Sequence, residues 1–384
     1  MDRKNSLDLS KQSQGQIQKK ILFISTLTPP NGGSAMSSEM CLNILKEDKR
    51  FIVRNIKLNY SLNMSDIGKI NLKKVYGLFQ VRKQIRGLLR QFQPNIIYFV
   101  PAVAGFALIR DYYFLWIIKK LKKGKLILHI RVQFKNKDWN NPIKKLIIQD
   151  LLGCDKAIVL GPELIENLKN RVPIENIRIL PNAIPNVLTD INFEKIMWQR
   201  SLNNNLQILF LSNMHETKGW FKVLEACKLL IDSGIKFICH FVGEWTSKSD
   251  SQKFYEYIEI NNLLNNIIFH GQLLKNEKNG MLAMADILIF PTEYDACPRV
   301  IIEAMEFGLS IIANREGTIP SLIRHGETGY ILQKNTAVEI FEYILKLLDR
   351  SVRDEMGING RHRFLEKFTL DTYKTRFIEI LNED

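Results

Sequence analysis

Short apolar runs alternate along most of the chain with longer segments that have helical spacing. Most of the short runs are nearly continuous in Ile, Val, Leu and Phe, as in strands of a parallel sheet that are buried on both faces. Strands that alternate with helices indicate βαβ units. The predicted strands are Ile21–Ser25, Ile52–Lys57, Ile96–Val100, Leu126–Ile130, Ala157–Leu160, Ile177–Leu180, Gln207–Leu211, Phe237–Val242, Ile267–Phe269, Ile287–Pro291 and Leu309–Ala313.

The pattern predicts an α/β protein with two doubly wound domains. A linker is expected between Asn182 and Asn205, where Pro185, with Pro181 just before the range, and three consecutive asparagines are loop signals. The polar segment 1–19 is expected to be a disordered tail. These limits leave a first domain at 20–187 and a second at 206–363. Within the remaining segment, 364–384, an amphipathic helix is predicted from Phe364 to Leu381.

Composition narrows the class of protein. Of the 384 residues 46% are hydrophobic and 24% charged, which is ordinary for a soluble globular protein. The five cysteines are scattered without a CxxC pair, which argues against a disulfide scaffold and a local zinc site and favours a reducing compartment. No secretory leader is recognisable. The longest uncharged apolar run, Ile96 to Ile109, is shorter than the roughly 20 residues that span a bilayer. We therefore expect a cytoplasmic protein.

The charge is distributed unevenly between the two halves. The net charge of the chain is +14, yet residues 1–190 hold 32 basic and 14 acidic residues while the remainder holds 22 and 26. A one-sided basic field attracts nucleic acid, anionic lipid or a phosphorylated ligand, although a solvated lysine-rich face also fits. No RNA-binding or zinc-finger motif appears, so no nucleic-acid partner is expected.

Two loops that follow predicted strands have features of phosphate sites. Gly32 and Gly33 follow the first strand, and paired glycines let backbone N–H groups approach a phosphate closely. Lys218 precedes a helix predicted from Trp220 to Ile231, where a point charge and free N–H groups come together. Each feature also occurs without a ligand, in any tight loop or at any solvated lysine. No GxGxxG is present, which argues against a dinucleotide-dependent dehydrogenase.

The most specific string runs from Pro291 to Gly308, PTEYDACPRVIIEAMEFG. A buried strand enters an acidic loop, Pro298 is a plausible helix start, and Gly308 fits the glycine that ends a helix. Asp295 lies in the loop and Glu303 within the helix, so both can face a ligand at the carboxyl edge of the sheet. Carboxylates accept hydrogen bonds from sugar hydroxyls, and the helix N-terminus offers N–H donors to phosphate.

This string resembles the family 4 (group 1) glycosyltransferases of the GT-B fold, whose pattern is Glu, seven residues, Glu-Ala-Met, then Gly. Further landmarks agree in order: the Gly-Gly loop, LPNAIPN, LFLSNMHETKG, FVGEW, FHGQL, ADILIFPT and HGETGYIL. The resemblance covers roughly residues 20–380. It implies two Rossmann-like domains facing across a cleft, with the C-terminal helix packing back on the first, acceptor-side domain and the nucleotide sugar bound by the second.

The resemblance also implies roles for individual residues. Lys218 would bind the donor diphosphate, Glu303 the nucleotide ribose, and Asp295 the hydroxyls of the donor sugar. The further donor contacts that it implies are Gly32, Gly33 and, through the main chain, Leu273, Ala296, Cys297 and Pro298.

Three positions depart from the family pattern. Asp295 replaces the usual glutamate and is one methylene shorter, and Glu293 lies nearby at the wrong offset. Asn213, within the donor-binding loop, stands where the family usually has a second phosphate-binding arginine. Arg131 stands where many members carry a catalytic histidine, and His129 is adjacent and on the same face of the strand. We assign Arg131 as the second catalytic residue, and infer that it restores the cation missing at Asn213.

The resemblance predicts transfer of a sugar from a nucleotide-diphosphate sugar to a glycan or lipid-linked glycan, with retention at the anomeric carbon, in cell-surface polysaccharide synthesis. No Asp-x-Asp pair occurs, so no metal is expected to clamp the diphosphate, and no cofactor is expected. A degenerate sugar-nucleotide binding module without turnover and a GT-B-like sugar-nucleotide epimerase are the alternatives.

A peripheral membrane surface is predicted in the first domain. Between Ile67 and Arg110 there are eight basic residues and no acidic one. Helices are predicted over Leu72–Phe92 and Asp111–Lys123, and both combine apolar or aromatic residues with basic ones. The apolar stripes would equally cover a sheet and leave the lysines solvated. The functional interpretation is a surface that docks on anionic lipid at the inner face of the membrane.

Overall fold

The structure, a computed structural model, describes residues 18–28, 33–58, 72–102, 105–134, 140–168 and 171–383. The chain divides into two compact units, Met1–Leu128 and His129–Asp384. The predicted tail lies, up to residue 17, outside the described residues.

The first sheet has six strands in the order β2-β1-β3-β4-β5-β6. The pairs β1–β2, β1–β3, β3–β4 and β5–β6 are parallel. Ile21, Leu22 and Phe23 are fully buried, as expected for a strand covered on both faces. The strands are β1 (Lys19–Ser25), β2 (Phe51–Lys57), β3 (Ile96–Phe99), β4 (Lys125–Ile130), β5 (Lys156–Val159) and β6 (Ile177–Ile179).

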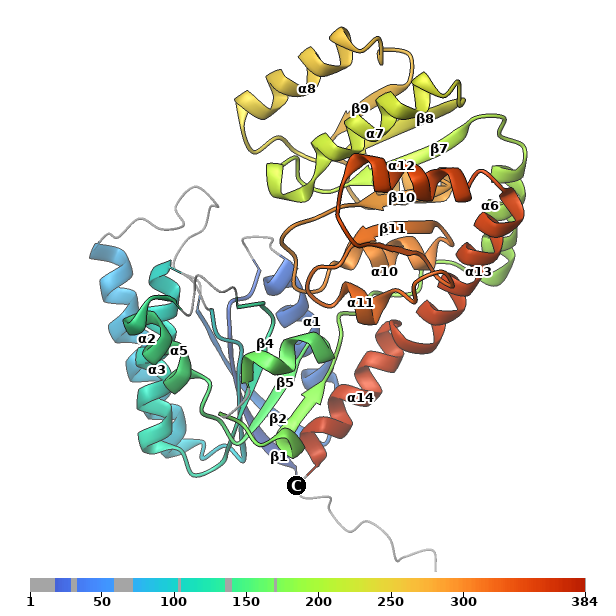
Figure 1. Cartoon of the computed structure of the whole chain (residues 1–384). Coiled ribbons are helices and arrows are strands. Elements are labelled where there is room, and N and C mark those ends of the chain that lie inside the picture. The colour runs from blue at the N-terminus through green and yellow to red at the C-terminus, as the bar shows by residue number, and fades with distance from the viewer. Residues whose placement is uncertain are drawn as a thin grey trace, which may run out of the picture. The chain divides into compact units, whose positions relative to one another are not determined.

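Helices cover both faces of this sheet within the first unit. Helices α2 (Leu72–Gln91) and α3 (Gly105–Leu121) pack together on one side of the strands, and α1 (Gly33–Glu47) lies on the other (Figure 1). Helix α3 begins at Gly105, six residues before Asp111, where the helix was predicted to start. Helix α5 (Pro142–Leu151) starts with a proline, and Asn141 caps it by accepting a hydrogen bond from the amide of Lys144.

The second sheet also has six parallel strands, in the order β12-β11-β10-β7-β8-β9. Its core contains Phe210, Trp220 and Phe254, all nearly inaccessible to solvent. Strand β12 was not predicted, since three residues carry too little pattern. The strands are β7 (Leu206–Leu211), β8 (Phe237–Val242), β9 (Ile267–Gly271), β10 (Ile287–Phe290), β11 (Ser310–Asn314) and β12 (Tyr330–Leu332).

Helices again lie on both faces of the second sheet. In Figure 1, α7, α8 and α12 lie on one side and α10 on the other. The α/β class with two parallel six-stranded sheets is thus confirmed. The helices of this part are α6 (Asp190–Ser201), α7 (Trp220–Asp232), α8 (Lys248–Ile260), α9 (Lys275–Met284), α10 (Arg299–Glu306), α11 (Ile319–Leu322), α12 (Ala337–Lys346), α13 (Arg350–Lys367) and α14 (Leu370–Asn382).

Two predictions of local structure were wrong. The linker Asn182–Asn205 contains helix α6, which begins after Thr189, whose hydroxyl accepts a hydrogen bond from Asn192 N. The prolines precede this helix and the asparagines follow it, so the loop signals marked only its ends. The helix predicted from Phe364 to Leu381 is two helices, α13 and α14. Thr369 interrupts it because its side chain caps the new helix.

Helix α14 is attached to β5 and β6 by polar contacts. Lys156, on β5, is buried, and its Nζ donates to Ile380 O at 3.1 Å and to the carbonyl and carboxylate of Glu383 at 3.1 and 3.3 Å. The same carboxylate accepts a hydrogen bond from Arg178, on β6. We call this cluster of Lys156, Arg178 and Glu383 the α14 latch. The predicted limits of the two domains stay predictions.

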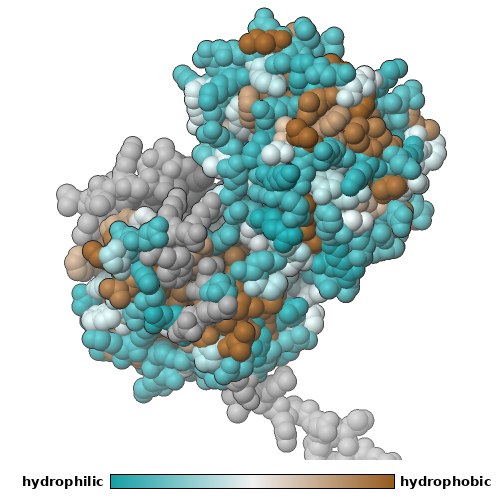
Figure 2. Space-filling model, viewed as in Figure 1, coloured by the Kyte–Doolittle hydropathy of each residue, from teal (hydrophilic) through white to brown (hydrophobic). Residues whose placement is uncertain are grey.

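The surface carries both kinds of residue in patches. On the face shown in Figure 2, hydrophilic residues predominate, and hydrophobic ones gather in smaller areas. Among the described residues, no helix is both long and apolar enough to cross a bilayer.

Candidate donor-binding site

The loops after β7 and β10 lie together because these two strands are neighbours in the sheet. The amide of Glu293 donates to Thr217 O at 2.7 Å. Gly219 has a φ of +78°, and a Cβ there would lie 2.5 Å from Pro291 O. The close approach of the two loops therefore depends on a glycine at this position. The structure brings together two motifs that are more than 70 residues apart in the sequence.

Lys218 and Asp295 form an ion pair at this edge of the sheet. Lys218 Nζ lies 2.8 Å from Asp295 Oδ2 and donates to Tyr294 O at 2.9 Å. The two side chains are 20% and 26% exposed, so the pair is open to a ligand. The predicted phosphate-binding lysine and the predicted sugar-binding carboxylate are thus in direct contact.

Glu293, the alternative to Asp295, pairs with a different lysine. Its Oε1 lies 2.6 Å from Nζ of Lys222, on α7, and its side chain is 54% exposed. Of the two acidic residues in the loop, Asp295 is therefore the one beside Lys218.

Glu303 lies on α10 and also has a cationic partner. Its Oε1 is 2.8 Å from Nζ of Lys278, on α9, and its side chain is only 16% exposed. Sequence reasoning missed Lys278. It lies five residues after the predicted base contact Leu273, and that proximity was the available signal. Its pairing with Glu303 follows only from how the helices fold over the sheet.

The loop between Asp295 and α10 is held by main-chain contacts. Thr318 N donates to Ala296 O at 2.9 Å, and the Asn182 side chain donates to Cys297 O at 2.8 Å. A Cβ on Gly317, whose φ is +53°, would lie 2.1 Å from Asp295 O. These contacts fix the backbone at the predicted donor contacts.

Two of those donor contacts have properties that limit what they offer. Burial raises the pKa of the Cys297 thiol to about 11, which keeps it neutral. Pro298 is the residue that precedes α10, and it has no N–H, so a ligand can find only a carbonyl there.

Arg131 and His129 lie side by side at the end of β4, as the alternation of the strand predicts. A guanidinium nitrogen of Arg131 is 3.4 Å from His129 Nδ1, and both residues are buried. Burial and the neighbouring Arg131 hold the pKa of His129 well below its ordinary value, so its imidazole is neutral. The catalytic role of Arg131 stays a prediction.

The remaining predicted contacts are spread over several elements. Asn213 is exposed after β7, and its carbonyl accepts a hydrogen bond from His215 N. Leu273 is half-buried between β9 and α9. Gly33 begins α1, and Gly32 lies outside the described residues. Over the described ranges, no three His, Cys, Asp or Glu side chains gather in a way that would hold a metal ion.

Comparison with known proteins relates the region that holds this site to one protein family. Residues 192–363, which include Lys218, Asp295 and Glu303, match the family described as glycosyl transferases group 1. The chain resembles the group 1 glycosyltransferases. Its predicted assignment to family 4 is consistent with this match.

Relatives and solved structures extend the comparison. The chain is 28% identical over 187 residues to N-acetyl-alpha-D-glucosaminyl L-malate synthase of Bacillus anthracis (46% of each chain), and 28% identical over 229 residues to the capsular polysaccharide biosynthesis glycosyltransferase CapM of Staphylococcus aureus (59% of this chain, 55% of CapM). The matched region thus spans about half the length of these relatives.

Two solved structures match nearly the whole chain. A glycosyltransferase of Rickettsia africae has a TM-score of 0.71 at 18% identity (96% of this chain, 100% of the other). HepE of Anabaena in complex with UDP has a TM-score of 0.71 at 16% identity (95% and 99%). At these identities the likeness concerns the fold, and it confirms the predicted GT-B fold.

Proposed function

We propose that the protein is a retaining glycosyltransferase that moves a sugar from a nucleotide-diphosphate sugar to a glycan or lipid-linked glycan. The observation that carries this proposal is the Lys218–Asp295 pair at the carboxyl edge of the second sheet, within a region that matches group 1 glycosyltransferases. HepE was solved with UDP and with UDP-glucose, which supports a nucleotide-sugar donor. The likeness to CapM supports a role in cell-surface polysaccharide synthesis.

The proposed donor site exchanges internal ion pairs for contacts with the ligand. Lys218 leaves Asp295 for the diphosphate, and Asp295 then accepts hydrogen bonds from the sugar hydroxyls. Glu303 likewise accepts the ribose hydroxyls when its pairing with Lys278 relaxes. The N-terminus of α10 adds partial positive charge beside the phosphates. Main-chain hydrogen bonds hold these loops, from Glu293 N to Thr217 O and from Thr318 N to Ala296 O, so the exchange requires movement of side chains alone.

The proposed reaction keeps the anomeric configuration by attack on the face that the diphosphate leaves. The bond between the anomeric carbon and the phosphate oxygen breaks, the acceptor oxygen bonds to that carbon, and the acceptor proton passes to the departing phosphate oxygen. Lys218, helix N-termini and Arg131 stabilise the negative charge that develops on the diphosphate, in place of a metal. Asp295 positions the sugar and does not bond to it.

A donor screen followed by a transfer assay tests this function. A nucleotide sugar at 100 times its Kd stabilises the protein by about 2.7 kcal/mol, which a thermal shift detects. The donor found in this way is then incubated with an acceptor panel, and NMR of the product reports the anomeric configuration. Activity that survives EDTA supports the metal-free step. Donor binding with no transfer or hydrolysis would leave a binding module, and an inverted product would overturn the proposed stereochemistry.

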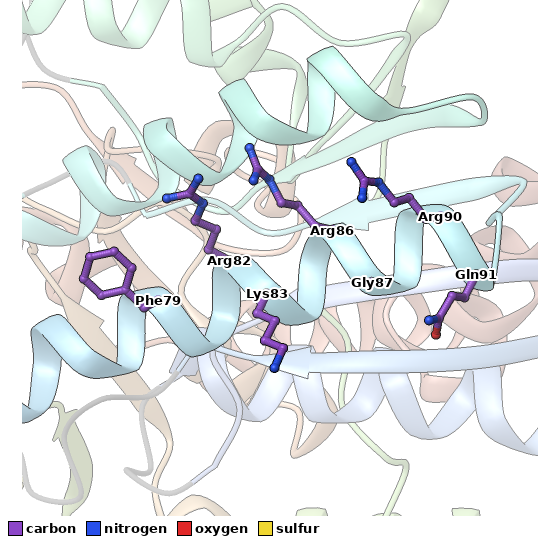
Figure 3. A pocket seen from close by; sticks show the side chains of 7 residues that line it. All are labelled: Phe79, Arg82, Lys83, Arg86, Gly87, Arg90 and Gln91. Carbon is purple, nitrogen blue, oxygen red and sulfur yellow. The ribbon is translucent and has the colours of Figure 1, made fainter.

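We also propose that the protein works at an anionic membrane surface through helix α2. Arg82, Arg86 and Arg90 follow one another at intervals of four, and in Figure 3 their guanidinium groups extend to the same side of the helix. They line a groove of about 450 Å³ together with Phe79 and Lys83. Among the described residues none of these four cations forms an ion pair, and Arg86 Nε is buried without a hydrogen-bond partner.

Exposed aromatic residues accompany these cations. Tyr76 and Phe79, near the start of α2, are 66% and 60% exposed. On the adjacent α3, Trp116 is 43% exposed, and Lys120 lies over its ring at 3.9 Å. Aromatic residues that flank basic ones are typical of surfaces that lie at the interface of a membrane. Each basic residue near such a surface contributes about 1 kcal/mol, and salt screens this attraction.

Vesicle co-sedimentation tests the membrane proposal. The protein should sediment at low salt with vesicles that contain phosphatidylglycerol, stay in solution with phosphatidylcholine alone, and be released at high salt. Replacement of the four cations of α2 by glutamine should abolish sedimentation and leave the melting temperature unchanged. If the protein ignores anionic vesicles at low salt, the surface is merely solvated. The control replaces four exposed lysines of the second unit, Lys236, Lys248, Lys253 and Lys334.

A further inference from the structure

A second cavity lies within the unit His129–Asp384, lined by elements other than the donor-site loops. Its volume is about 460 Å³. Its walls come from the segments after β5 and at the end of β6, from α11, and from the junction of α13 and α14. The lining residues that matter to the argument are Leu160, Leu322, Arg363, Lys367, Thr372 and Arg376.

The cavity has an apolar, buried interior. Leu160, Leu180 and Leu322 are at most 3% exposed, and Phe368 and Tyr373 are at most 4% exposed. Cavities of this size with predominantly apolar walls and a few polar groups are typical of sites for small organic molecules. The break between α13 and α14 contributes to the cavity, because Phe368 lies at that break.

Positive charge predominates among the polar residues of the lining. Arg363, Lys367 and Arg376 contribute three cations, and Glu366 is the one acidic residue in the lining. Lys367 lies 3.7 Å from the carboxylate of Glu366, a distance at which the exposed pair is weak. Arg376 is exposed and forms no ion pair with any described residue.

Arg363 is held in place by the cavity wall. Its guanidinium donates to the carbonyls of Leu322 and Ser321, both at 2.6 Å, and lies 5.8 Å from the centroid of the Phe368 ring. Burial lowers the pKa of Arg363, but an arginine remains charged at neutral pH. Its hydrogen bonds go to neutral carbonyls, and the carboxylates of Glu366 and Glu327 act on it only through their charge, against the opposing charge of Arg324.

We propose that this cavity is a binding site for an amphipathic organic anion, a molecule with an aromatic or aliphatic body and a single sulfonate, carboxylate or phosphate group. The body fills the space between Leu160, Leu322 and Phe368, and the anionic group meets Arg376 and Lys367 at the rim. This site is distinct from the donor site, and the proposal does not rest on the proposed transferase activity.

The test uses 8-anilinonaphthalene-1-sulfonate, whose fluorescence rises in apolar surroundings, with the full chain. We expect saturable binding with one site per chain. N-phenyl-1-naphthylamine has the same rings without the sulfonate, so it should bind at least tenfold more weakly. Thr372→Trp fills the cavity and should abolish the saturable signal. The double variant Lys367→Glu and Arg376→Glu should weaken sulfonate binding at least tenfold.

Two control variants locate the binding. Lys253→Glu, an equal reversal of charge at an exposed position on α8, should leave the affinity unchanged. Lys218→Ala should also leave it unchanged, which separates this cavity from the donor site. Melting temperatures confirm that each variant is folded. Absence of saturable binding, equal binding of the neutral probe, or binding unchanged in both cavity variants would overturn the proposal.

Discussion

The replacement of Lys218 by alanine is the most informative test of the donor site. In the free protein Lys218 Nζ is already bound to Asp295 Oδ2 at 2.8 Å and to Tyr294 O at 2.9 Å. A donor diphosphate must therefore take the ammonium group from a partner that it already has. The variant removes both the internal pair and the contact with the ligand.

The size of the effect follows from the difference between these two contacts. A hydrogen bond to a charged group contributes about 1.5–3 kcal/mol. The internal pair is partly exposed, and pairs of that kind contribute about 0.2–1 kcal/mol. The net loss of donor binding is therefore about 0.5–2.8 kcal/mol, which corresponds to a roughly 2- to 110-fold rise in Kd. The same change should lower the free energy of unfolding by less than about 1 kcal/mol.

Isothermal titration calorimetry with the cognate nucleotide sugar measures this rise. Lys222→Ala is the matched control, because Lys222 forms an ion pair of the same kind with Glu293 only four residues further along the chain. We expect Lys222→Ala to change Kd less than threefold. If a folded Lys218→Ala protein binds the donor as tightly as the original, Lys218 does not contact the diphosphate. If Lys222→Ala has the larger effect, the site is centred on Glu293 instead.

Three further predictions concern the site and the fold. Asp295→Asn should lower kcat with little change in KM, while Glu303→Gln should raise the donor Kd at least tenfold; full turnover in Asp295→Asn would refute its contact with the reacting sugar. Lys156→Met should lower the free energy of unfolding, measured in urea, by about 2–3 kcal/mol, because it removes the donor from the buried carbonyl of Ile380 and the partly buried carbonyl of Glu383; an effect no larger than that of Arg178→Met would contradict this. Burial and a neighbouring histidine lower the pKa of His240 to about 4. In the unfolded chain this histidine is protonated below about pH 6.5, whereas in the folded protein it is protonated only near pH 4. The free energy of unfolding should therefore fall as the pH drops from 6.5 to 4. In urea unfolding across this pH range, His240→Gln should make the free energy of unfolding depend less on pH.

The strands were predicted well from the sequence because buried parallel strands consist of nearly continuous apolar residues. Ile287–Pro291, for example, needed correction by only one residue. Strand β12 escaped because it has only three residues. Helix α6 was not predicted because the prolines before it and the asparagines after it together suggested one long loop. The break at Thr369 depends on a single capping side chain, which does not interrupt the apolar spacing on either side.

The part of the candidate site that lies in loops after strands was predictable, because the carboxyl ends of parallel strands meet at one edge of the sheet. Lys218 and Asp295 follow β7 and β10, and the adjacency of these strands brings the two side chains together. Lys278 was not predictable in this way. Its contact with Glu303 joins two helices. The sequence pattern of a helix does not fix where that helix lies on the sheet, because this depends on how the side chains pack.

The α14 latch has a consequence for synthesis of the protein on the ribosome. Lys156 emerges early, but its carbonyl partner on Ile380 follows 224 residues later. At about 5–20 residues per second, translation of that interval takes roughly 10–45 s. During this time the nascent chain carries β5 and β6 without the helix whose last residues bind Lys156 and Arg178. Until α14 has been synthesised, the ammonium group of Lys156 is exposed to water, whereas in the folded protein it is buried. A hydrated charge on β5 opposes association of this part of the sheet with other apolar surfaces during that time.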